Sequence, residues 1–164
     1  MRFLPAENIT YKTRLKPEEI NKRLSDIVES KKAFSIFSSS STKSYEGQIN
    51  DQMFDIKRII GYRNSFLPRI KGTILRDYDG ITIKVKMRLH IFVIVFLCFW
   101  FGSAGFGFIV VLTQSFNLEF DVRTLIPFGM LLFVYGITMG GFKFESYKSK
   151  KELQKIFEAE IIEK

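Results

Sequence analysis

The sequence is poor in the side chains from which catalytic and metal sites are usually built. Among its 164 residues there is one cysteine, Cys98, and one histidine, His90. One cysteine excludes a disulfide within the chain, and one imidazole without further Cys or His ligands does not make a zinc site. The P-loop, dinucleotide-binding and nucleophile-elbow patterns are also missing. We therefore expect no enzymatic activity, no metal and no cofactor.

Charged side chains are absent from two long stretches, residues 91–112 and 125–142. A helix needs about 20 apolar residues to cross a bilayer, because each residue adds about 1.5 Å. The first stretch is long enough, and the second lies at the short end of the spanning range. Only twelve residues separate them, so the pattern predicts a transmembrane hairpin over residues 90–143, its first crossing counted from about His90. We interpret this histidine as an interfacial polar residue.

Basic residues are distributed unevenly along the chain. Residues 1–89 carry 18 Lys or Arg against 10 Asp or Glu, and residues 143–164 carry six against five. Residues 90–142, which lie between these two parts, carry one Lys or Arg against two Asp or Glu. Because an excess of Lys and Arg beside membrane helices marks the cytoplasmic side, we expect both termini in the cytoplasm. The first ten residues lack the apolar core of a signal peptide, so the first crossing is expected to direct insertion.

Residues 1–89 are predicted to form a cytoplasmic β-domain that contains one helix. Pro17 and the two acids after it are typical of a helix start, and apolar residues at helical spacing follow for roughly four turns. Alternation of apolar and polar residues indicates the strands. These lie at residues 9–15, 33–37, 45–49, 53–60, 66–75 and 81–89. The last strand has one apolar face and one wet, basic face.

Four apolar residues near the C-terminus recur at helical spacing, namely Leu153, Ile156, Phe157 and Ile161. They predict an amphipathic helix over residues 145–162, within a segment 144–164, that packs on the β-domain. The predicted fold class is therefore a membrane α+β protein. It combines a small antiparallel β-barrel or β-sandwich, flanking amphipathic helices, and a two-helix transmembrane hairpin inserted before the C-terminal helix.

The densest polar and aromatic cluster of the predicted β-domain lies between residues 57 and 71. Guanidinium groups, an aromatic ring and an amide can together hold a phosphate and stack on a base. The candidate ligand-binding residues are Arg58, Tyr62, Arg63, Asn64, Arg69 and Lys71. Two other interpretations stay open, because basic residues near a leaflet bind anionic lipid at roughly 1 kcal/mol each and residues 62–65 could form a structural bend. Nucleic acid is a weaker candidate, since the positive-inside rule accounts for the same charge.

Small residues at a spacing of four occur in both apolar stretches. They are Ser103 and Gly107 in the first, and Gly136 and Gly140 in the second. Such spacing lets two helix backbones approach closely. It fits either packing of the hairpin against itself or contact between copies in a homo-oligomer. No ionisable residue lies inside either stretch, so no proton or ion path is indicated.

Two membrane helices joined to a small basic β-domain resemble the two-transmembrane β-barrel effectors of bacterial cyclic-nucleotide antiphage signalling. The resemblance implies that the barrel binds a cyclic nucleotide, and that the ligand controls self-association in the membrane and damage to it. That family places its helices before the barrel, whereas here the strands come first. The order of strands and then helix is similar to that of a bacterial pleckstrin-homology-like domain interrupted by a hairpin.

These patterns lead to two functional hypotheses. The first is a non-enzymatic inner-membrane sensor and effector of antiphage defence, whose β-domain binds a cyclic nucleotide and whose hairpin oligomerises to disrupt the bilayer. The alternative is a non-toxic, membrane-anchored scaffold or lipid-binding interaction module of pleckstrin-homology-like type. Selective binding of one nucleotide would favour the first. Binding to anionic lipid that weakens steadily with salt would favour the second.

Overall fold

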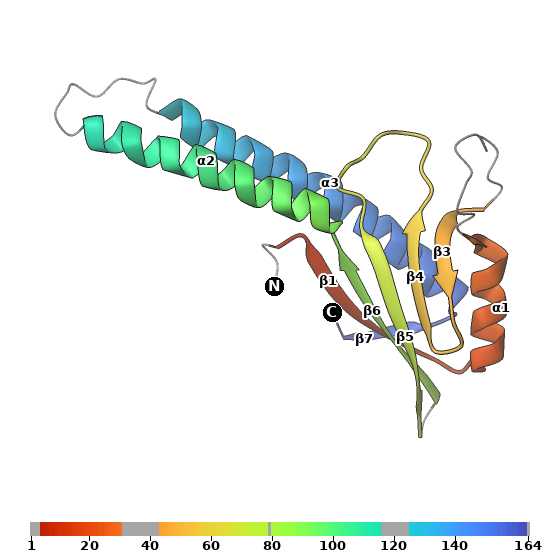
Figure 1. Ribbon diagram of the computed structural model, residues 1–164. Helices are drawn as coiled ribbons and strands as arrows, with labels where there is room; N and C mark the ends of the chain where they lie inside the picture. Colours follow the sequence, from red (N-terminus) through yellow and green to blue (C-terminus); the bar gives the residue numbers. More distant parts are fainter. Residues whose placement is uncertain (1–3, 31–42, 79, 116–124, 164) are drawn as a thin grey trace.

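The structure is a computed structural model that describes residues 4–30, 43–78, 80–115 and 125–163. Within these residues a mixed seven-stranded sheet lies beside three helices, two of which project away from it as a long pair (Figure 1). The elements follow the order β1 (Ala6–Thr13), α1 (Pro17–Ile27), β2 (Val28–Ser30), β3 (Tyr45–Ile49), β4 (Met53–Arg58), β5 (Arg69–Asp77), β6 (Gly80–Arg88), α2 (Ile91–Ser115), α3 (Ile126–Ile156) and β7 (Glu160–Glu163).

The sheet is open, with the strand order β2-β3-β4-β5-β6-β1-β7 and two free edges, β2 and β7. All neighbours pair antiparallel except β2 and β3, which run parallel. The predicted β-barrel or β-sandwich is therefore wrong. An open sheet suffices because the C-terminal half of α3 crosses behind it and covers the apolar face, as Figure 1 shows. No second sheet or barrel closure is needed to bury that face.

The core lies between one face of the sheet and the two helices that pack on it. Its largest fully buried side chains come from β1, β3, β4, β5, β6, α1, α3 and the residue after α3: Ile9, Tyr11, Tyr45, Ile56, Ile70, Ile83, Met87, Ile20, Leu24, Phe142, Leu153 and Phe157. The rings of Tyr11 and Phe157 meet edge to face with centroids 5.9 Å apart. Each such burial stabilises the fold by roughly 1.5–3 kcal/mol before entropy is counted.

The alternating pattern predicted for residues 81–89 is confirmed in β6. Its apolar residues are buried, whereas Lys84, Lys86 and Arg88 are exposed on the opposite face. The N-terminal helix is also confirmed, although it ends at Ile27 because Val28 begins β2. The predicted strand 66–75 starts later, at Arg69, since Leu67 and Pro68 are buried in the loop before it. The strand predicted at residues 33–37 lies outside the described residues.

The separate C-terminal helix predicted at residues 145–162 does not exist. Residues 145–156 continue the second apolar helix without a break, so that α3 spans 31 residues. The helix stops where Glu158 adopts a left-handed backbone, with φ of 45°. The chain then returns along β1 as β7, so Ile161 belongs to a strand. Leu153 and Phe157 of this segment belong to the core beneath the sheet.

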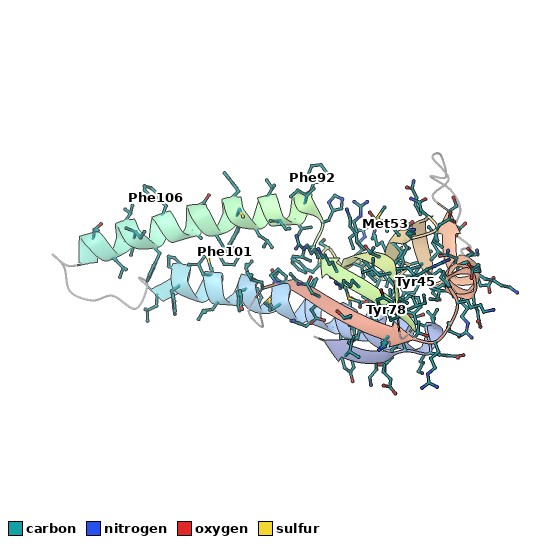
Figure 2. The ribbon with its side chains drawn as sticks, turned by 90° about the horizontal axis from the view of Figure 1, so that it is seen from below. Tyr45, Met53, Tyr78, Phe92, Phe101 and Phe106 are labelled. Carbon is teal, nitrogen blue, oxygen red and sulfur yellow. The ribbon has the colours of Figure 1, made fainter. Side chains whose placement is uncertain are left out.

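The helices α2 and α3 are long and apolar enough to cross a membrane. Their large side chains are largely uncovered, and Phe92, for example, is 77% exposed. Figure 2 shows Phe92 and Phe106 on the side of α2 that faces away from α3, with Phe101 between the two helices. Exposed apolar surface on this scale is typical of a surface that contacts a membrane or another protein.

Candidate functional site

The six residues predicted to bind a ligand separate into two groups in the structure. Arg58 and Tyr62 turn toward α3 and contact its carboxylates. Arg69 and Lys71 instead lie on the open face of the sheet, beside Asp55. The structure therefore does not gather these residues into one site.

The first group surrounds a buried carboxylate. Glu145 of α3 has no exposed surface, and it accepts hydrogen bonds from Arg58 Nη1 at 3.2 Å and from the Tyr62 hydroxyl. Arg58 Nε also lies 3.6 Å from Glu152, one heptad further along α3. The Tyr45 hydroxyl donates to Glu152 at 2.9 Å. We call these five residues the carboxylate cluster.

Both tyrosines of the carboxylate cluster are held in the neutral form. Burial raises the pKa of Tyr45, and the charge of Glu152 raises it further. The hydrogen bond to Glu145 raises the pKa of Tyr62. The carboxylates thus face hydroxyl donors and one guanidinium, which is an arrangement for holding a helix in place.

The loop between β4 and β5 is also fixed against α3. The Asn64 side-chain oxygen accepts the Phe66 backbone N–H at 2.9 Å, and its amide nitrogen lies 3.5 Å from the Gly141 carbonyl. A Cβ atom at Gly141 would lie 3.1 Å from the Phe66 ring, so the loop approaches α3 closely. This geometry matches the structural-bend interpretation of residues 62–65. Arg63 is exposed at the tip of that bend.

The second group of predicted residues belongs to a larger basic surface. Arg69 donates to both oxygens of Asp55, at 2.6 and 2.8 Å, and Lys71 Nζ lies 3.7 Å from the same carboxylate. The hydrogen bond to Asp55 raises the pKa of Arg69. Across the sheet, Arg69 pairs directly with Arg88, and Lys71 pairs directly with Lys86.

We call Arg69, Lys71, Lys86 and Arg88 the cation square. Neighbouring strands lie about 4.8 Å apart and alternate residues of one strand about 7 Å apart, so four cations share one small area. Like charges directly opposite each other destabilise a sheet. Within the described chain, no ion pair balances Lys86 or Arg88, and Asp55 offsets only the β5 side. A surface of this kind favours an anion.

The sequence predicted that one face of β6 is basic, but it did not predict a binding site there. The signal that could have found the cation square is the tight β5–β6 hairpin, whose register pairs Asp77 with Gly80. Counting back from that turn places Lys71 opposite Lys86 and Arg69 opposite Arg88. Arg88 also ends β6, and only Leu89 and His90 separate it from the start of α2 at Ile91, which places the cation square beside the base of the helix pair.

A hollow of about 300 Å³ adjoins the cation square. Its polar lining comes from β3, β4, β5, the β4–β5 loop and the residue before α2: Glu46, Gln48, Asp55, Lys57, Asn64, Ser65, Arg69 and His90. Unlike the cation square, the hollow carries carboxylates and cations in equal number. Its volume lies at the small end of the range for ligand sites.

A second set of contacts holds α3 to β1 and lies beside its apolar segment. Lys143 Nζ lies 2.6 Å from one oxygen of Glu7, and the Ser146 hydroxyl donates to the other at 2.7 Å. Burial opposes the ionisation of Glu7, but these two hydrogen bonds and the positive charges of Lys143 and Lys150 together outweigh it and lower the pKa of the carboxyl. Glu7 is therefore ionised at neutral pH and holds the helix by its charge.

The glycines predicted to make helix contacts are not packed against any other described element of the chain. A Cβ atom at Gly107, Gly136 or Gly140 would have no heavy atom within 4 Å among the described residues. Ser103 donates its hydroxyl to the Phe99 carbonyl of its own helix at 2.8 Å. The pairing of α2 with α3 in one chain thus does not use these glycines, and contact between copies stays a prediction.

Within the described residues, no group of three or more His, Cys, Asp or Glu side chains is placed to hold a metal ion. No protein-family model, no curated protein and no solved structure matches the chain. The function is therefore inferred from the cation square, the hollow and the apolar helix pair.

Proposed function

We propose that the protein is a non-enzymatic, membrane-anchored module whose open sheet face binds the anionic headgroups of the leaflet beside it. In this proposal α2 and α3 cross a bacterial inner membrane as a hairpin, and both ends of the chain lie in the cytoplasm. The single observation that carries the proposal is the cation square, which lies next to the first residue of α2.

Electrostatics favours phospholipid as the occupant of this surface. Each Lys or Arg near an anionic leaflet contributes about 1 kcal/mol of attraction. Lys86 and Arg88 of the cation square, with Lys84 beside them on the same face of β6, together contribute about 3 kcal/mol. Bound phosphates would also relieve the repulsion within the two like-charged pairs. Because the hairpin already anchors the chain, this energy sets the orientation of the sheet against the membrane.

The exposed face of α3, on the side of the domain away from the open sheet face, supports the membrane crossing of that helix. Lys148 Nζ lies 4.0 Å from the centre of the Phe144 ring, and Lys151 Nζ lies 4.6 Å from that of Tyr147. Both rings are more than half exposed, although they belong to the part of α3 that leaves the apolar segment. Aromatic rings and long basic side chains are enriched where membrane helices reach the headgroups.

The test uses the full chain in detergent micelles, titrated with dihexanoyl phosphatidylglycerol or dihexanoyl phosphatidylcholine. Binding is read from the midpoint of thermal unfolding, which a ligand of the folded state raises. We expect the anionic lipid alone to raise it, with an effect that declines as sodium chloride is added. Replacing Lys84, Lys86 and Arg88 by Gln should weaken binding roughly a hundredfold, the equivalent of about 3 kcal/mol.

The matched control replaces Arg14, Lys22 and Lys155 by Gln, which removes the same charge from exposed positions outside the cation square. This control should bind phosphatidylglycerol like the parent chain. Protease protection of the C-terminus in vesicles checks that neither triple variant inverts the hairpin. Equal binding of the two lipids by the parent, or unchanged binding by the first variant, would refute the proposal.

A second candidate function is the oligomerising effector of antiphage defence, and the open glycines favour it. Gly136 and Gly140 leave a flat face on α3 that no described residue of the same chain covers. In this proposal, copies of the chain meet at that face when the β-domain binds a cyclic nucleotide. Induced expression should then arrest growth, and Gly136→Leu should relieve the arrest while Ile137→Leu does not. Harmless expression of the parent, with and without cyclic nucleotides, would exclude this candidate.

A further inference from the structure

The hollow beside the cation square has a charge pattern that simple attraction to anionic lipid does not explain. Glu46 and Asp55 contribute two negative charges, and Lys57 and Arg69 contribute two positive ones. An anion alone would meet repulsion from the carboxylates, whereas a zwitterion can satisfy both signs. We propose that the hollow binds a phospholipid headgroup that carries a primary ammonium, of the ethanolamine type. This inference rests on the proposed function, because it requires the hollow to lie at the membrane surface.

The donors for the phosphate are gathered at the side nearest α2. Arg69 begins β5, Ser65 lies in the loop above it, and His90 immediately precedes α2. The His90 ring stacks on Phe92, with centroids 5.4 Å apart and planes at 12°. Its Nδ1 accepts the Phe92 backbone N–H at 3.4 Å, which leaves Nε2 as the nitrogen that donates.

The acceptors for the ammonium lie on the opposite side, on β3. Glu46 and Gln48 point to the open face, where the register places them beside Lys57 and Asp55 of β4. Both carboxylate oxygens of Asp55 already accept hydrogen bonds from Arg69, so Glu46 is the carboxylate that can accept one from a ligand. Its pair with Lys57 is 3.7 Å long and about half exposed. A pair of this kind contributes little, so a bound ammonium can replace it.

The width of the sheet matches the length of this headgroup. β3 and β5 are separated by β4, so their residues lie about 10 Å apart, which is two strand spacings. With a charge-assisted hydrogen bond of about 2.8 Å at each end, a ligand that reaches from one strand to the other has its two charges only a few ångströms apart. A phosphate ester and an ammonium joined by two methylene groups span that distance. The trimethylammonium of choline has the same spacing but no N–H to donate, so the hollow should reject it.

The experiment compares dihexanoyl phosphatidylethanolamine with dihexanoyl phosphatidylcholine on the full chain in detergent micelles. Their dissociation constants are read from thermal-unfolding midpoints at increasing lipid concentration. We expect the ethanolamine lipid to bind about tenfold more tightly, as one charge-assisted hydrogen bond would provide. The variant Glu46→Gln should remove that preference.

The control variant is Glu18→Gln, since Glu18 is an exposed acid with a similarly long ion pair, 3.6 Å to Arg76. This variant should keep the tenfold preference. Equal affinity for the two lipids in the parent chain, or a preference that survives Glu46→Gln, would overturn the inference. Phosphatidylglycerol separates the two proposals: if it still binds through the cation square, only the ethanolamine site is refuted, and if it does not, the proposed function fails as well.

Discussion

The buried ion pair between Arg58 and Glu145 should respond very differently to the loss of each partner. In Arg58→Met the fully buried carboxylate keeps only its hydrogen bond from Tyr62. In Glu145→Gln the shape remains, Tyr62 keeps an acceptor, and Arg58 keeps Glu152 at 3.6 Å. We therefore expect Arg58→Met to be the more damaging change, although both remove the same ion pair.

The magnitudes follow from burial. Leaving one partner of a buried pair without its counter-charge costs about 3–5 kcal/mol, and the partly exposed Arg58 side chain, at 24%, places this case at the lower end. Replacing a charged hydrogen-bond partner by a neutral one of the same shape costs about 1 kcal/mol. For a domain of about a hundred residues these values lower the melting temperature by about 12–24 °C and about 4–8 °C.

Hydrogen exchange of the full chain in micelles, followed by mass spectrometry, measures how much each variant lowers the stability of the strands, separately from that of the apolar helices. The double variant Arg58→Met with Glu145→Met should recover part of the loss, because no unpaired charge remains buried. If Arg58→Met costs no more than Glu145→Gln, or if the double variant is no more stable than Arg58→Met alone, the cost of an unpaired buried charge does not explain these effects.

Three further predictions concern other contacts of the fold. Glu7→Gln should cost about 1.5 kcal/mol of stability at neutral pH. Because the pKa of Glu7 in the folded protein is lowered from 4.5, this difference in stability should persist above pH 4.5 and vanish as the pH falls through the pKa of the folded state. Thermal unfolding measured at a series of acid pH values tests this. Gly72→Ala should cost about 1–3 kcal/mol in thermal unfolding, since a Cβ there overlaps the Phe54 ring, whereas Gly61→Ala meets no atom and serves as control. Gly136→Leu should leave unfolding of the isolated chain unchanged and shift any oligomer in micelles to monomer, measured by light scattering.

Local patterns in the sequence predicted much of the soluble fold. The alternation in β6 and the apolar spacing of Ile20 and Leu24 in α1 each report which side of an element is buried. Such patterns act over a few residues, so they hold whatever the rest of the chain does. The two uncharged stretches likewise predicted the apolar helices, because length and composition alone determine that property.

The errors arose where distant residues decide the structure. Glu145 was not among the predicted site residues, because its partner Arg58 lies 87 residues earlier in the sequence. The periodicity around Leu153 was correctly interpreted as helical, but it contains no signal for where the helix begins. No proline interrupts the segment between the apolar stretch and Leu153, so α3 simply continues. The prediction of a closed barrel was wrong for a related reason, because the same helix covers the face of the sheet that a barrel would have buried.

The continuity of α3 links the candidate membrane site to the fold. Its 31 residues rise about 46 Å, enough to cross a bilayer and then the sheet. Glu7 holds it from β1 through Lys143, and Arg58 holds it from β4 through Glu145, within one turn of each other. A helix held from both sides at the point where its apolar segment ends cannot turn independently of the sheet. Under the proposed function, the direction in which the cation square faces would therefore be set by the tilt of the hairpin, and headgroups bound to that square would act on the tilt in return.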